Sequence, residues 1–198
     1  MMKKLLPAVF IVRDGILSEL VFDDARQKLV PPCRPELLCL RRRAGSFLRE
    51  LNAMGFLCLS IASEMSGAVL SPILRDRIQR RLRGDLEGQG ARLHGSYSFS
   101  YNSKEATRVH AETEVILKAA TTHRVEMHRS FLIAHDLEDV IAGRSAGLAT
   151  IWVSGSPAQA IEAYERNPDG RPDRLCGSLD EVLTVIRVDA RIGANPSF

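Results

Sequence analysis

The stretch Ala8-Val9-Phe10-Ile11-Val12-Arg13-Asp14-Gly15-Ile16 decides the fold of this 198-residue chain. Its apolar run enters a polar Arg-Asp-Gly turn, which is the pattern of a buried strand that ends in a loop. In sheets built from parallel strands, ligands bind at the carboxyl ends of the strands. The turn at residues 13–15 therefore lies at the end of the sheet where a ligand would bind.

Apolar runs typical of strands alternate with helical patterns along the rest of the chain. The expected strands cover residues 8–12, 56–61, 131–134 and 149–153, with a weaker candidate at 174–176. The expected helices cover 35–54, 72–83, 113–122, 137–146, 157–166 and 179–186. This alternation predicts βαβ units around a mainly parallel sheet, and hence a three-layer α/β/α sandwich.

Length and composition favour one domain over residues 1–198. A content of 45% hydrophobic residues is enough for a proper core. The stretch 84–107 is rich in glycine and serine, and it predicts a loop insertion around a short strand. An insertion of this size leaves the domain with a minimal cap or none.

Charge and cysteine usage exclude several classes of protein. A net charge of +3 is too small to indicate nucleic-acid binding. The 4 cysteines are scattered, which favours reduced thiols over a disulfide or zinc framework. No apolar run approaches the roughly 18 residues of a membrane span, and the start of the chain does not resemble a signal peptide. We expect a cytoplasmic protein with an arginine-rich, solvated helix at 72–83; contact of that helix with an anion or with RNA is the alternative.

The opening stretch resembles the first motif of the haloacid dehalogenase (HAD) superfamily, F-[LI]-D-R-D-G-[VI]-[LI]. This form is similar to the branch of histidinol-phosphate and heptose-bisphosphate phosphatases. In that family the first Asp is the nucleophile and the second is the general acid/base. The resemblance places Asp14 at the acid/base and Val12 at the nucleophile. Because valine cannot attack phosphorus, it implies a phosphatase fold that has lost its nucleophile.

Two further motifs of the family have counterparts in order along the chain. Residues 62–67, A-S-E-M-S-G, resemble T-N-Q-S-G and imply phosphate binding by Ser63, Ser66 and Gly67. An ordinary Ser/Gly turn is the alternative for that segment. The third motif supplies a lysine that neutralises phosphate charge, and its helical end resembles residues 108–120 with His110 at the lysine. A histidine is mostly neutral at cytosolic pH, so the fixed positive charge is weakened.

The fourth motif reads V-G-D-x-x-x-D-I-x-A-G-x-A-A-G in the family, and residues 133–147 resemble it closely. Asp139 is kept, together with the small residues around it. His135 stands at the Asp that binds Mg²⁺, and Asp136 follows one position late. Since Mg²⁺ prefers oxygen ligands, this departure puts the metal site in doubt.

The resemblance extends from about residue 8 to about residue 186, and it implies a catalytically degenerate HAD phosphatase-like protein without a cofactor. Such a pseudophosphatase would act by binding, as a regulator or a subunit of a complex. The alternative is a HAD phosphatase or hydrolase with a rearranged, Mg²⁺-dependent site that uses Asp14, Asp136 or Asp139 on a small phosphorylated metabolite. We also expect His110 or His135 to contact Asp14 or Asp139 in place of a metal.

The sequence leaves the partner open. A protein, a small anionic ligand or a second copy of the chain in a homo-oligomer would each suit a binding role. Neither a membrane nor a nucleic acid is expected.

Overall fold

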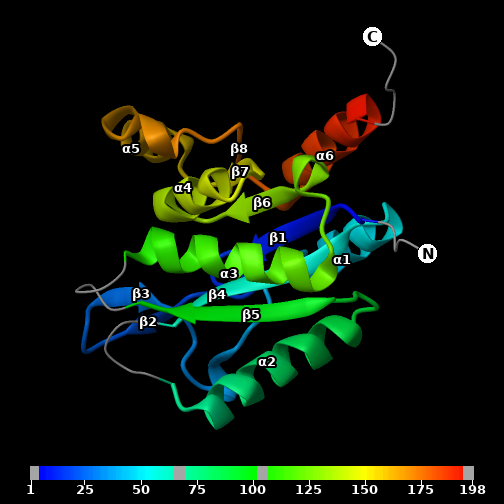
Figure 1. The fold of residues 1–198 in the computed structure, drawn as a ribbon. Helices are drawn as coiled ribbons and strands as arrows, with labels where there is room; N and C mark the ends of the chain where they lie inside the picture. The colour runs from blue at the N-terminus through cyan, green and yellow to red at the C-terminus, as the bar shows by residue number, and fades with distance from the viewer. Residues whose placement is uncertain (1–4, 65–69, 102–106, 194–198) are drawn as a thin grey trace.

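A central sheet of six parallel strands organises the computed structural model, which describes residues 5–64, 70–101 and 107–193. The strand order is β5-β4-β1-β6-β7-β8 (Figure 1). Their bounds are β1 Ala8–Val12, β4 Leu57–Glu64, β5 Gly95–Ser100, β6 Phe131–Ala134, β7 Ala149–Val153 and β8 Arg174–Cys176. This arrangement confirms the expected parallel α/β architecture.

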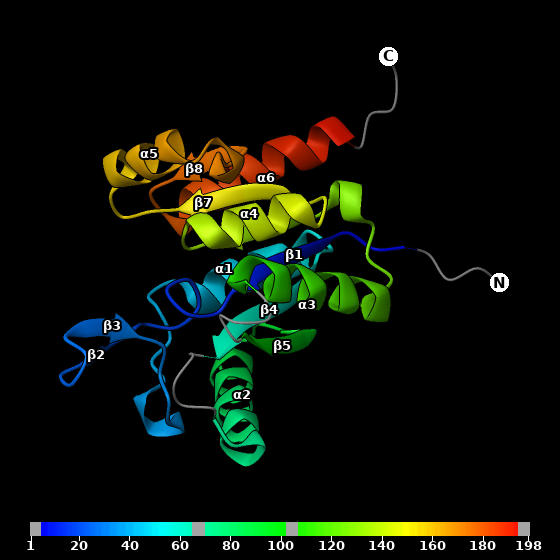
Figure 2. The same ribbon diagram turned by 60° about the vertical axis from the view of Figure 1, so that its left-hand side comes forward.

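Helices cover both faces of the sheet and make it a three-layer sandwich (Figure 2). Helices α3 and α4 pack side by side on one face, with α5 beside α4, while α1 packs against α6 and α2 on the other. Their bounds are α1 Ala44–Ala53, α2 Pro72–Glu87, α3 Arg108–His123, α4 Leu137–Ser145, α5 Pro157–Arg166 and α6 Leu179–Gly193. No helix of the described residues is long and apolar enough to cross a membrane.

Strand β1 lies at the centre of the core. All its residues are buried, and it pairs with β4 on one side and β6 on the other. Such two-sided burial explains the continuous apolar run that marks this strand in the sequence. The carboxyl ends of β1, β4 and β6 consequently meet at one edge of the sheet, where residues 13–18 turn away from β1.

A small antiparallel hairpin stands beside this edge. Strands β2 (Val21–Asp23) and β3 (Lys28–Val30) form it between β1 and α1. It is the only element of the described residues that resembles a cap, in agreement with the expected minimal cap.

Several expected boundaries differ from the structure. The helices expected at 113–122 and 179–186 are the longer α3 and α6. The helix expected at 35–54 begins only at Ala44, because Leu40 bridges to Ser18 and Arg43 has a left-handed backbone with φ of 78°. Within the stretch 84–107, α2 continues to Glu87, and Gly95–Ser100 is a strand of the main sheet. The alternating serines of this edge strand hide it from a search for apolar runs.

Ser130 ties the start of β1 to the loop before β6. Its hydroxyl accepts a hydrogen bond from the backbone N–H of Ala8 (2.9 Å) and donates one to the carbonyl of Glu126 (2.7 Å). Ser130 is only 1% exposed, so water cannot replace these bonds.

We expect Ser130→Ala to lower the free energy of unfolding by about 1–3 kcal/mol, since it leaves buried backbone groups without partners. Urea denaturation measures this change. Ser145→Ala is the matched control, because it removes an exposed hydroxyl that bonds only within α4, and it should change stability by less than about 0.5 kcal/mol. Equal effects of the two variants would contradict the role assigned to Ser130.

Candidate functional site

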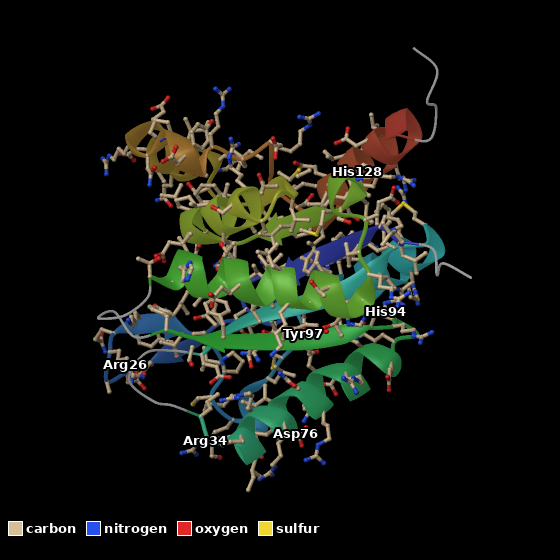
Figure 3. All side chains as sticks on the ribbon, viewed as in Figure 1. Arg26, Arg34, Asp76, His94, Tyr97 and His128 are labelled. Carbon is tan, nitrogen blue, oxygen red and sulfur yellow. The ribbon has the colours of Figure 1, made fainter. Side chains whose placement is uncertain are left out.

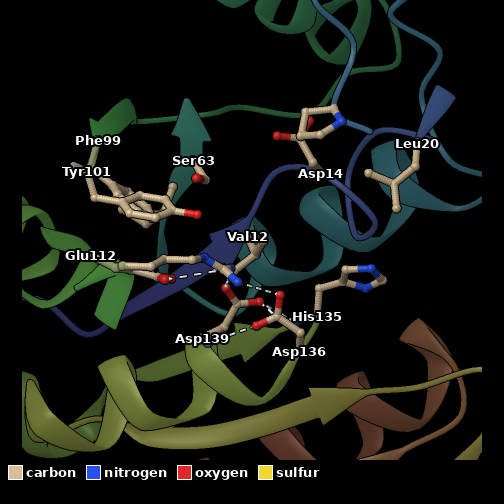
Figure 4. Close-up of a pocket in the computed structure, with 13 residues that line it drawn as sticks. Val12, Asp14, Leu20, Ser63, Phe99, Tyr101, Glu112, His135, Asp136 and Asp139 are labelled. Atoms are coloured by element: carbon tan, nitrogen blue, oxygen red, sulfur yellow. Dashed lines mark hydrogen bonds and ion pairs between the residues drawn. The ribbon is translucent and has the colours of Figure 1, made fainter. Parts of the chain in front are cut away.

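A pocket of about 270 Å³ opens at the carboxyl ends of the central strands (Figure 4). One side of it is apolar and aromatic, with Val12, Ile61, Phe99 and Tyr101 on its surface. The opposite side carries carboxyl groups from α3 and α4. The fold therefore brings part of the predicted motif residues to one cavity, as parallel strand ends do in α/β proteins. These residues are Val12, Asp14, Ser63, His135, Asp136 and Asp139.

The β1 end of the pocket presents no free carboxylate. Val12, the last residue of the strand, lines the cavity with an apolar side chain. Asp14 is buried, and its two carboxylate oxygens each accept a hydrogen bond of 2.8 Å from the Arg13 guanidinium. Ser18 donates a further hydrogen bond of 3.0 Å to Asp14. The Asp14 carboxylate is thus hydrogen-bonded to residues of its own turn.

His135 follows β6 and turns its ring toward that same turn. A Cβ atom at Gly15 would lie 2.7 Å from three atoms of the imidazole, so only glycine allows this close approach. Gly15 also has φ of +86°, a conformation that favours glycine. Burial lowers the pKa of His135, although Asp136 opposes the shift, and the ring is therefore neutral at pH 7.

Asp136 and Asp139 form a reciprocal cap at the start of α4. The Asp136 side chain accepts a hydrogen bond from the Asp139 N–H (3.0 Å), and the Asp139 side chain accepts one from the Asp136 N–H (3.0 Å). Asp139 also accepts a hydrogen bond of 2.8 Å from the backbone N–H of His135. This capping box fixes both carboxylates relative to the end of β6.

Arg108, the first residue of α3, supplies the positive charge of the acidic side. Its guanidinium lies 2.7 Å from an Asp136 oxygen and 2.8 Å from a Glu138 oxygen, and it also pairs with Asp139. Burial alone would lower the pKa of Arg108, but Asp139 and Asp136 outweigh it and the net shift is upward. The guanidinium is therefore a permanent cation bridging α3 and α4.

The structure corrects the predicted place of His110. Its side chain is 63% exposed, and Nε2 lies 3.2 Å from an oxygen of Glu114 on the outer face of α3. Two positions along a helix correspond to a rotation of about 200°, so Arg108 and His110 point in opposite directions. Of the expected histidine–carboxylate contacts, only His135 reaches Asp139, and it does so through its backbone.

Glu112 is a second site residue that the sequence motifs did not indicate. It lies one helical turn after Arg108, its side chain is 1% exposed, and Arg108 Nη2 is 3.9 Å from its Oε2. Neither carboxyl oxygen has a hydrogen-bond partner within the described residues. Burial raises the pKa of Glu112, and the nearby Asp139 raises it further. An Arg-x-x-x-Glu spacing on a buried helix face is the signal that could have located both residues.

Ser63 lies at the end of β4 and lines the pocket as expected. Ser66 and Gly67, the other expected phosphate-binding residues, lie outside the described part of the chain. The rings of Phe99 and Tyr101 stand near Ser63 with centroids 6.5 Å apart (Figure 4). Aromatic side chains thus border the region that would hold phosphate in a HAD enzyme.

Four arginines of α2 pair with carboxylates on the helix or near it. Asp76 projects outward from this helix (Figure 3) and pairs with Arg80 at 2.7 Å. Other pairs on the helix or at its base are Arg75 with Glu64, Arg77 with Glu36 and Arg81 with Asp85. These pairings support the interpretation of a solvated helix face.

Comparisons with known proteins identify the fold. No protein-family model matches the sequence, and no curated protein matches it. Among solved structures, D,D-heptose 1,7-bisphosphate phosphatase from B. bronchiseptica, complexed with magnesium and phosphate, superposes with a TM-score of 0.75 at 14% identity, over 93% of this chain and 99% of that one.

Two more similar structures agree with this result. A putative HAD-like phosphatase from Mesorhizobium loti gives a TM-score of 0.71 at 20% identity, over 94% of this chain and 88% of that one. The cobalt-bound deoxy-D-mannose-octulosonate 8-phosphate phosphatase from Haemophilus influenzae gives 0.58 at 14% identity, over 93% and 88%. The chain therefore has the fold of the HAD-superfamily phosphatases.

Proposed function

We propose that this chain is a HAD-fold protein that has lost phosphatase chemistry and acts by binding, as a regulator or as a subunit of a complex. The observation that carries the proposal is the ion-pair cluster in which Arg108 contacts Asp136, Glu138 and Asp139. An internal cation there neutralises carboxylates that would otherwise need a metal ion.

The nucleophile position supports the same proposal. An aspartyl-phosphate intermediate requires a carboxylate that faces the substrate. Val12 has no nucleophilic atom, and the Asp14 carboxylate is held by Arg13 and Ser18. A rearranged site would have to free Asp14 from both partners before that residue could attack or transfer a proton.

The residues of the pocket do not fit Mg²⁺. This ion demands near-octahedral oxygen ligands at about 2.1 Å. Val12 offers no oxygen, and His135 packs its ring against Gly15. Asp136 and Asp139 give oxygens to Arg108 and to the backbone of α4. Within the described residues, no group of three or more His, Cys, Asp or Glu side chains is arranged to hold a metal ion.

We expect the purified protein to hydrolyse p-nitrophenyl phosphate and sugar phosphates at far below ~1 s⁻¹, the lower end of ordinary enzyme turnover. A colorimetric assay with and without Mg²⁺ measures this rate. Turnover that requires Mg²⁺ and is abolished by Asp14→Asn would overturn the proposal and support the rearranged enzyme.

Replacing Arg108 should destabilise the fold strongly. Arg108→Gln leaves buried Asp139 without its cation, and breaking such a pair costs about 3–5 kcal/mol. Chemical denaturation measures the loss. Arg129→Gln is the matched control, since this arginine is 42% exposed and pairs with Glu126 on the surface; it should cost at most about 1 kcal/mol. A similar small loss for both variants would show that Arg108 is not needed to neutralise the cluster.

Metal binding should return only when the internal cation is removed. We expect Val12→Asp alone to bind no Mg²⁺, because Arg108 still pairs with Asp136 and Asp139. Combining Val12→Asp with Arg108→Gln leaves the introduced carboxylate, Asp136 and Asp139 without a cation. Adding about 10 mM Mg²⁺ as a probe should then raise the melting temperature of this double variant, because the ion stabilises the folded state. Magnesium stabilisation of the unmodified protein would contradict the idea that Arg108 replaces the metal.

A further inference from the structure

The pocket has more carboxyl groups than cations. Glu112, Asp136 and Asp139 all line it, and Arg108 is the only arginine or lysine that lines it among the described residues. Asp14 is balanced by Arg13 within its own turn. Burial raises the pKa of both Glu112 and Asp139, because the negative form of each has too little countercharge nearby, and a phosphate group would add further negative charge to this side of the cavity.

Glu112 is a buried member of this group of carboxyl groups, so the group is not only a surface cluster. Its side chain is 1% exposed, and both oxygens are without a hydrogen-bond donor in the described part of the chain. Arg108 pairs with Glu112 only at 3.9 Å, whereas its guanidinium lies 2.7 Å from Asp136, 2.8 Å from Glu138 and also pairs with Asp139, so Glu112 is the most weakly balanced carboxyl group of the cluster. A buried carboxyl group that lacks a partner at the wall of a cavity indicates that a positively charged group from outside the chain would complete the site.

The opposite side of the pocket favours an organic cation over a metal ion. Phe99 and Tyr101 stand side by side at the end of β5, and Val12, Leu20 and Ile61 complete the apolar surface. Aromatic faces attract ammonium and guanidinium groups, and apolar side chains bury the body of the molecule that carries them. A hydrated metal ion gains nothing from such a wall.

We propose that the pocket binds a small organic monocation, an ammonium or guanidinium group on an aromatic or apolar body, with its charge against Glu112 and Asp136. The proposal rests on the absence of phosphatase chemistry proposed above. It reverses the ligand charge relative to the phosphorylated substrates named for the structural neighbours and to the anionic ligand expected from the sequence.

A titration with three probes of similar shape tests this inference. Benzylamine, benzyl alcohol and phenyl phosphate differ in charge while they share one aromatic ring, and NMR chemical-shift changes report binding to the full chain. We expect benzylamine to bind at least about tenfold more tightly than either other probe. Glu112→Gln should weaken benzylamine binding by about tenfold or more. Glu114→Gln, on the exposed face of the same helix, should leave it unchanged, and thermal melts should confirm that both variants fold.

The outcomes separate this inference from the proposed function. Hydrolysis of phenyl phosphate would overturn both. Binding of benzyl alcohol or unhydrolysed phenyl phosphate as tightly as benzylamine would overturn the cation site and leave the proposed function intact. Three other results would likewise overturn the cation site and leave the proposed function intact. These are equal loss of binding in the two glutamate variants, failure of benzylamine to bind, and displacement of benzylamine by Mg²⁺.

Discussion

The pairing of Arg108 with Asp139 is the interaction on which the site depends. Asp139 is buried, and it caps α4, accepts the backbone N–H groups that follow β6 and meets the guanidinium from α3. A carboxylate in this position needs a countercharge, because burial raises its pKa and the adjacent Asp136 raises it further. The protein supplies the countercharge from its own chain, and in doing so it ties two neighbouring helices to the end of the central sheet.

The other departures from the HAD motifs are consistent with that internal cation. A carboxylate at Val12 would add negative charge to a cluster that Arg108 already balances only in part. The imidazole of His135 lies under Gly15, where it contributes packing to the turn after β1. Asp14 keeps its place but bonds to Arg13 and Ser18. These residues are the basis for the proposal that the chain does not use metal and phosphate, and they occur within a HAD-like fold.

The sequence predicted the parts of the structure that follow from periodicity and local chemistry. Buried β1 has a continuous apolar run, and the helix expected at 137–146 is α4, Leu137–Ser145. The hairpin at 21–30 escaped prediction, and the short strand expected within 84–107 was not assigned to the main sheet, because these strands are short, polar or only partly buried. Their pairing is set by contacts with distant segments, which a local pattern does not contain.

The motif comparison placed the positively charged position of the site at His110 instead of Arg108, and the reason is geometric. Motif alignment put His110 at the lysine, yet the helix begins at Arg108, and a shift of two positions turns a side chain from the pocket to solvent. The helix was expected to begin only at residue 113, so nothing in the pattern assigned Arg108 or Glu112 to its inner face. Sequence similarity could therefore indicate which catalytic groups are missing, whereas only the three-dimensional arrangement indicates what replaced them.

In a HAD-like fold the cavity forms independently of the catalytic side chains. The cavity exists because parallel strands end together, and this depends on β1, β4 and β6 rather than on any catalytic side chain. The pocket therefore does not depend on which residue stands at the position of Val12, and the side chains that line it from α3 and β5 bear on its selectivity. Because Arg108 pairs with Asp136 and Asp139, the carboxyl group of Glu112 and the rings of Phe99 and Tyr101 are the reason we propose a cation rather than a phosphate ester as its ligand.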